Sequence, residues 1–174
     1  IPFKWQGASQ TEMITDSDNT DFGDASINEW VIETNGNGTC VYDAGPGAVK
    51  TALVTIGATP GTYTGGKLPT TQISTFTEGK VVRVQAQVYL PTGHAWTAAN
   101  VSVLNMANWT LLASSDANIA TLDAWQTIYR DYLVGADVTG DVFVGGSGTT
   151  AADVLYFDNI TITQLGAVAL YTQD

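Results

Sequence analysis

The residues that most often perform catalysis are scarce in this chain of 174 residues. His94 is the single histidine and Cys40 the single cysteine, so a serine triad would have one candidate base and a thiolate zinc site is excluded. Only four glutamates are present: Glu12, Glu29, Glu33 and Glu78. None lies in an apolar strand that would raise its pKa, as the acid of a glycosidase pair requires. No Gly-x-Ser-x-Gly, phosphate-binding loop or His-Glu-x-x-His sequence occurs. The sequence therefore predicts a protein that is not an enzyme.

Residues 80–90 could instead bind a ligand. Arg83, Gln85, Gln87 and Tyr89 alternate with Val82, Val84, Ala86 and Val88, so they are expected on the solvent face of a strand whose other face is buried. One interpretation is an ordinary polar outer surface. The other is a polar, aromatic-rimmed groove for a ligand across a sheet.

Aromatic residues outside the core pattern are further candidates. Trp96 and Tyr63 lie in expected loops and Trp109 at the start of an expected strand. Exposed aromatic rings can stack on sugar rings, but they are equally enriched at contacts between subunits. Both interpretations of these rings stay open from the sequence.

Asp158 is the most unusual acidic residue. In residues 154–165, Tyr156, Asp158, Ile160 and Ile162 are expected to share one face, which places a carboxylate in line with core residues. Such a group must accept hydrogen bonds or coordinate a cation. The acidic stretch 16–24 resembles an EF-hand loop only superficially, since Asp21 occupies the position that requires glycine.

The elements that must position these residues are short strands. Runs of strand-forming residues are separated by Gly, Pro, Asn and Asp clusters, and no window has a clear helical period. A helical turn near residues 116–123 is the most helix expected. The sequence predicts an all-β protein, an antiparallel β-sandwich.

Composition excludes several partners. Six Lys and Arg against 17 Asp and Glu give a net charge of −11, which repels nucleic acid and anionic membrane surfaces. No apolar run is long enough to span a bilayer, so membrane insertion is not expected. The first residue is Ile1, which suggests that a leader was removed or that the chain is a segment of a longer protein.

Several short motifs, taken in order, resemble one family. They are Phe22, Trp30, Lys50–Thr55 (KTALVT), Gly79–Tyr89 (GKVVRVQAQVY), Trp125–Thr127 (WQT) and Tyr156–Ile162 (YFDNITI). This order is similar to the jelly-roll carbohydrate-binding modules of the family 4 and 9 type, found in secreted polysaccharide hydrolases. Two positions depart from the family pattern: Gly23 stands where the family has Glu, and Lys80 is followed by Val81 instead of Tyr.

The resemblance carries expectations for fold and site. It implies a jelly roll over residues 16–166, preceded by a leader arm (1–15), with Trp30 and Trp125 packed in the core. It also implies one structural calcium ion, held by Asp158 together with Asp21 or Asp24. The alternative for Asp158 is a clasp that accepts hydrogen bonds from the opening turn.

The tail 167–174 resembles the ends of such modules in phage tail fibres and other virion appendages. It is expected to lead to a next domain or to contact a neighbouring subunit. The preferred hypothesis is a carbohydrate-binding domain of an extracellular or virion-surface appendage protein, used for attachment to a glycan or polysaccharide. Two alternatives are an accessory module of a secreted glycoside hydrolase and a structural or decoration domain that binds no sugar.

Overall fold

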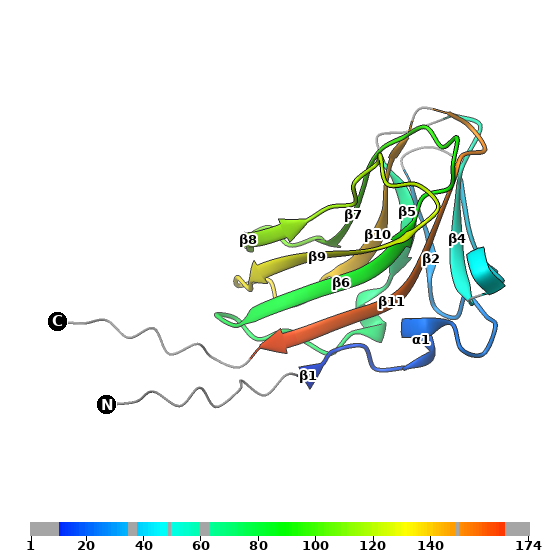
Figure 1. Ribbon diagram of the computed structural model, residues 1–174. Helices are drawn as coiled ribbons and strands as arrows, with labels where there is room; N and C mark the ends of the chain where they lie inside the picture. The colour runs from blue at the N-terminus through cyan, green and yellow to red at the C-terminus, as the bar shows by residue number, and fades with distance from the viewer. Residues whose placement is uncertain (1–10, 35–37, 49, 60–62, 149, 166–174) are drawn as a thin grey trace, which may run out of the picture.

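The computed structural model describes residues 11–34, 38–48, 50–59, 63–148 and 150–165, and most of its elements are β-strands. Two antiparallel sheets pack against each other as a sandwich (Figure 1). This confirms the predicted all-β class and antiparallel architecture. Within the described residues, no helix reaches the length and hydrophobicity that crossing a bilayer requires.

The larger sheet has seven strands and the smaller sheet four. The larger runs in the order β3 (Gly38–Asp43), β4 (Thr51–Ile56), β11 (Val154–Leu165), β6 (Val81–Tyr89), β9 (Trp125–Leu133) and β8 (Thr110–Ser115), and β1 (Thr11–Glu12) pairs with β11. The smaller runs in the order β2 (Val31–Thr34), β5 (Thr64–Leu68), β10 (Asp141–Gly148) and β7 (Trp96–Leu104). Most strands that are paired in a sheet are distant in sequence, because the chain crosses repeatedly between the two sheets.

In the described part of the chain, helical structure is confined to three short pieces. They are α1 (Asp18–Asp21) and the 3₁₀ turns η1 (Pro46–Ala48) and η2 (Thr70–Gln72). The helical turn expected near residues 116–123 is wrong, since that segment forms a non-helical loop. Helix α1 forms instead in the acidic stretch, where the Asp16 carboxylate accepts a hydrogen bond from the backbone N–H of Asp18 at 3.0 Å.

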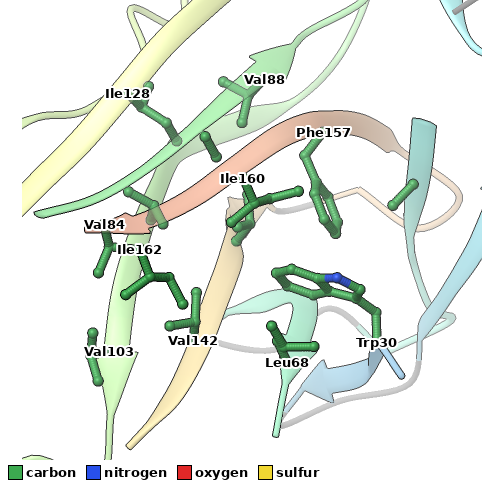
Figure 2. Close-up of a cluster of buried hydrophobic side chains, with 14 of the residues drawn as sticks. Trp30, Leu68, Val84, Val88, Val103, Ile128, Val142, Phe157, Ile160 and Ile162 are labelled. Carbon is green, nitrogen blue, oxygen red and sulfur yellow. The ribbon is translucent and has the colours of Figure 1, made fainter. Parts of the chain in front are cut away.

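The core lies between the two sheets and follows from the alternation of the strands. The inward-facing residues of β6, from Val82 to Val88, are fully buried. They meet inward-facing residues of β11 and of the smaller sheet, such as Ile162 and Val142 (Figure 2). At one end, Phe157 of β11 packs on Trp30 with ring centroids 4.9 Å apart. The expected core position of Trp30 is confirmed, at 2 % exposed.

The end of the expected leader arm is part of the sandwich. Thr11 and Glu12 pair with Gln164 and Thr163 of β11. Met13 and Ile14, which follow, are buried in the core. The structured region therefore begins before residue 16. Residues 1–10 and the expected tail 167–174 lie outside the described residues.

Candidate functional site

The four predicted polar residues of β6 share one face. Arg83, Gln85, Gln87 and Tyr89 are half-buried and alternate with fully buried neighbours. They lie on the outer surface of the larger sheet, whose strands bend along their length (Figure 1). The alternation in the sequence predicted this placement correctly.

The pairing register extends this surface across three strands. Residues directly opposite each other in an antiparallel pair point to the same side of the sheet. On β9, Trp125, Thr127, Tyr129 and Asp131 lie opposite Tyr89, Gln87, Gln85 and Arg83. On β11, Tyr156, Thr161 and Thr163 lie opposite Tyr89, Gln85 and Arg83. We call these eleven residues, together with Asn159 beside Gln87, the aromatic–amide face. Asp158 of β11 lies opposite Gln87, but it is buried and is not counted as part of this face.

One end of this face is aromatic. Tyr89 lies between two other rings, with its centroid 5.6 Å from that of Trp125 and 6.0 Å from that of Tyr156. The ring planes are inclined to each other by 58° and 82°. The three rings therefore form an uneven row across β9, β6 and β11, with edges as well as faces directed outward.

The middle of the face carries uncharged hydrogen-bonding groups. Gln87 accepts a hydrogen bond from the Asn159 side-chain amide at 3.1 Å. Gln85 follows on the same strand, flanked in register by Tyr129 and Thr161. Amide and hydroxyl groups of this kind can donate to or accept from ligand hydroxyls.

The far end of the face carries a compensated pair of charges. The Arg83 guanidinium donates to both carboxylate oxygens of Asp131, at 2.7 and 2.8 Å, and its carbon lies 4.4 Å from the centre of the Tyr129 ring. Such a bidentate pair fixes the guanidinium and cancels its charge. The face therefore presents aromatic, amide and hydroxyl groups, and the two charges among its own residues cancel.

Two predicted tryptophans do not belong to this face. Trp96 begins β7, is 2 % exposed and donates its indole N–H to the carbonyl of Val154 at 2.9 Å. The expectation of an exposed loop ring is therefore wrong for Trp96. Trp109 is half-buried, because its ring packs edge-on against Phe76 with centroids 4.9 Å apart. Its indole N–H donates to the carbonyl of Asp137, away from the aromatic–amide face.

Trp125 was expected in the core and lies on the outer surface instead. The mistake came from the resemblance, whereas the strand itself held the correct signal: Trp125, Thr127, Tyr129 and Asp131 alternate with the buried Ile128 and Tyr132. Tyr63 precedes β5 of the smaller sheet and packs edge-on against Phe143, so it is also remote from this face.

Asp158 lies on the side of β11 opposite to the one that the sequence pattern predicted. Strand β11 has a bulge between Asp158 and Thr161, where Asn159 adopts a φ of 50°. Tyr156, before the bulge, pairs with the outward-facing Tyr89, whereas Ile162, after it, pairs with the buried Val84. The prediction that these residues share a face is wrong, because an extra residue reverses the alternation.

The carboxyl of Asp158 is nevertheless only 3 % exposed, and its Oδ1 has no hydrogen-bond partner. Its Oδ2 accepts from the Asn159 amide at 3.1 Å. Burial raises the pKa of Asp158 to about 6. A hydrogen bond from the Asn159 backbone opposes this rise, and the nearby charge of Asp21 on α1 adds to it. Figure 1 shows α1 next to β11. A cation at this point would offset both the missing donor and the charge of Asp21.

The other predicted metal ligands are not equivalent. Asp21 accepts a hydrogen bond from the Gly23 N–H at 2.9 Å, and its charge also acts on Asp158, so it fits an oxygen-ligated cation there. Asp24 instead holds its own loop, accepting from the Ser26 N–H at 3.0 Å and the Asn28 amide at 3.2 Å. Among the described residues, no three His, Cys, Asp or Glu side chains converge on one point. A calcium ion at Asp158 and Asp21 would therefore depend on backbone, amide and water oxygens as well.

The histidine and the cysteine both have structural surroundings. The Trp96 N–H donates to Nδ1 of His94 at 3.0 Å, and Nε2 of His94 lies 3.1 Å from the Ile119 carbonyl oxygen. Burial raises the pKa of the Cys40 thiol to about 12, which leaves it protonated at neutral pH. Neither residue is part of the aromatic–amide face.

Comparisons with known proteins identify the fold. No family model and no curated protein matches the sequence. The CBM22-1 xylan-binding domain of Paenibacillus barcinonensis Xyn10C has a TM-score of 0.62 at 12 % identity, over 95 % of this chain and 100 % of that domain. The CBM22-2 domain of the same protein has a TM-score of 0.58 at 18 % identity, over 83 % of this chain and 97 % of that domain. The chain therefore has the jelly-roll fold of carbohydrate-binding modules.

The same fold also occurs in an enzyme. The Stig cyclase Fisc from Fischerella sp. TAU has a TM-score of 0.67 at 12 % identity, over 92 % of this chain and 100 % of that one. The two modules named above belong to family 22, and the family 4 and 9 type expected from the motifs is not confirmed. Because fold alone does not define function, the function must be argued from the aromatic–amide face.

Proposed function

We propose that this chain is a non-catalytic carbohydrate-binding domain and that a neutral polysaccharide chain binds on its aromatic–amide face. The observation that carries the proposal is the continuity of that face: three packed aromatic rings lead into amide and hydroxyl groups, and its two charges cancel. Aromatic rings offer apolar surface for the faces of sugar rings, while amides and hydroxyls pair with sugar hydroxyls.

The dimensions of the face suit an extended ligand. Tyr89 lies six positions after Arg83 on β6, which corresponds to about 20 Å along the strand. This length accommodates several sugar units in a row. A ligand with anionic sugars is disfavoured, because the guanidinium of Arg83 is already paired with Asp131 and the whole chain carries −11.

For its setting, we propose an extracellular or virion-surface appendage protein that uses this domain to attach to glycans. Neighbouring domains or subunits of a larger assembly would be further partners. The alternative setting, an accessory module of a secreted polysaccharide hydrolase, is favoured by one observation. The xylanase 10B of Clostridium thermocellum carries such a module beside its GH10 module, and the structure that shows it contains xylohexaose.

A glycan array tests the proposed function. We expect binding to one or more neutral polysaccharides, no binding to polyuronates, and little change in affinity between low and high salt. Gln87→Ala or Gln85→Ala should weaken binding by about 1–2 kcal/mol with little effect on the melting temperature, because each leaves ligand hydroxyls unpaired. Absence of binding to any glycan on the array would refute the proposal and favour the structural or decoration role.

One structural calcium ion is a second part of the proposal. It is supported by the unpartnered Oδ1 of Asp158 and by the adjacent negative charge of Asp21. The ion would supply a positive charge that ties the opening acidic stretch to β11.

A further inference from the structure

Tyr89, the central ring of the aromatic–amide face, is tethered by a residue from another loop. Its hydroxyl donates to Oδ1 of Asp123 at 3.3 Å. The same carboxylate accepts from the Thr92 backbone N–H at 2.9 Å and from the Thr92 hydroxyl. Asp123 therefore links the end of β6, the loop after it and the loop before β9.

The backbone of Asp123 is itself held in place. Its N–H donates to the carbonyl of Leu90 at 2.9 Å, and its φ is 54°, in the left-handed region that few non-glycine residues adopt. Asp123 also lies two residues before Trp125, the second ring of the row. Asp123 therefore constrains Tyr89 through the Asp123 side chain, and it constrains Trp125 through the short stretch of backbone between them.

The loop that carries Asp123 has a support of its own. The Gln126 amide donates to the carbonyls of Asn118 and Thr121, at 3.1 and 3.0 Å, and its Oε1 accepts from the Asn118 N–H at 2.9 Å. These bonds brace the loop from its start to the residues just before Asp123. The carboxylate is therefore presented to Tyr89 by a braced loop.

We propose that Asp123 is a positioning residue of the glycan-binding face: it fixes the Tyr89 ring between Trp125 and Tyr156 and directs the Tyr89 hydroxyl proton away from the ligand. The inference rests on the proposed function. A ring held before binding loses less side-chain freedom when ligand binds. Because the Tyr89 proton points to Asp123, the phenolic oxygen keeps lone pairs that accept from sugar hydroxyls.

The ionisation of the two groups is consistent with this arrangement. The pKa of Tyr89 is raised by desolvation among its neighbours, and the negative charge of Asp123 raises it further. The pKa of the Asp123 carboxyl is lowered, chiefly by the hydrogen bond from the Thr92 hydroxyl. The tyrosine therefore stays a donor and the aspartate stays an acceptor at neutral pH.

The test compares Asp123→Ala and Asp123→Asn with the wild type in calorimetric titrations with xylohexaose and with the best neutral glycan from the array. Asp137→Ala is the matched control. It removes the same charge from a residue whose carboxylate contacts the Asn108 amide at 3.3 Å, beyond the other end of β9. We expect Asp123→Ala to weaken binding about three- to tenfold, Asp123→Asn to weaken it less, and Asp137→Ala to leave it unchanged.

A second measurement does not require a ligand. In protein with isotope-labelled tyrosine, NMR reports the mobility of the Tyr89 ring and the titration of its hydroxyl. We expect Asp123→Ala and, more weakly, Asp123→Asn to increase ring mobility and to lower the titration midpoint of Tyr89. Unchanged ring signals together with unchanged affinity in both variants would overturn the inference. If the wild type binds no glycan, the proposed function fails, while the NMR measurement still decides whether Asp123 holds Tyr89.

Discussion

Asp158 shows how one residue can be identified from sequence for a partly wrong reason. The sequence placed it in line with Ile160 and Ile162, whereas the bulge puts it on the other side of β11. It is buried all the same, close to the acidic helix α1. What made the residue noticeable was a carboxylate within an apolar strand, and this signal was sound.

Calcium removal tests the role of Asp158. If the wild type binds calcium, a chelator should lower its melting temperature, because an ion bound only by the folded state stabilises that state. Asp158→Ala should abolish this dependence and cost about 2–4 kcal/mol relative to the calcium-bound wild type. In chelator, Asp158→Asn should be at least as stable as the wild type, since the buried charge is gone.

The two other acidic residues provide the contrast for this measurement. Asp21→Ala should reduce the calcium dependence, whereas Asp24→Ala should leave it intact, because the Asp24 carboxylate holds Ser26 and Asn28. If chelator leaves the melting curve of the wild type unchanged, the calcium proposal is wrong. Asp158 is then a buried carboxyl that accepts from Asn159 of its own strand, and the expected clasp to the opening turn is not formed, because its Oδ1 has no donor within the described residues.

Trp96 is the residue at which sequence and structure differ most. Its neighbours Pro91, Gly93 and His94 indicated a loop, but the strand begins at Trp96 itself and directs the ring into the core. Trp96→Ala should therefore destabilise the fold by about 3–5 kcal/mol, as expected for a buried aromatic residue. Urea denaturation measures this loss. Glycan binding by the folded fraction should be unchanged, and selective loss of binding at unchanged stability would contradict the structural role.

At the scale of elements, the strands with regular alternation were predictable and the irregular ones were not. β6 could be read within a residue at each end, because nine residues alternate without interruption. In β11, one extra residue breaks the period, and nothing in Asp158-Asn159-Ile160 marks the break in a single sequence. The outer-face row of Tyr156, Tyr89 and Trp125 was missed for this reason and because the resemblance assigned Trp125 to the core.

The smaller sheet depends on a close approach of strands that only glycine permits. A Cβ on Gly146 of β10 would lie 1.8 Å from the Ala98 carbonyl oxygen on β7, and backbone cannot yield as a flexible side chain can. We expect Gly146→Ala to destabilise the protein by about 2–4 kcal/mol. Gly93→Ala, at a loop position with φ of +88° and open space around it, should cost about 1 kcal/mol.

Thermal or urea unfolding of the two variants checks this difference. If Gly146→Ala and Gly93→Ala lower the free energy of unfolding equally, the close approach of β10 and β7 at Gly146 does not determine stability. The expected ranking follows from geometry: Gly146→Ala forces two strands apart, whereas Gly93→Ala strains a single backbone torsion.

At the scale of the whole molecule, many of the acidic residues lie outside the proposed binding face. The acidic residues of the opening stretch, from Asp16 to Asp24, contribute much of the net charge of −11. The aromatic–amide face itself carries one charged pair, Arg83 and Asp131, and the Asp123 carboxylate contacts it at the Tyr89 hydroxyl. A strongly acidic protein thus keeps a surface of mostly uncharged groups, which suits a ligand that is itself neutral.

The most direct test of this account is a calorimetric titration of the neutral glycan against three proteins. They are the wild type, the double variant Tyr89→Ala/Trp125→Ala, and the control Tyr63→Ala, which removes a tyrosine that packs edge-on against Phe143 of the smaller sheet. The account predicts that the double variant folds and loses binding by at least tenfold, while Tyr63→Ala binds like the wild type. Full affinity in the folded double variant would contradict it, as would loss of binding in Tyr63→Ala alone.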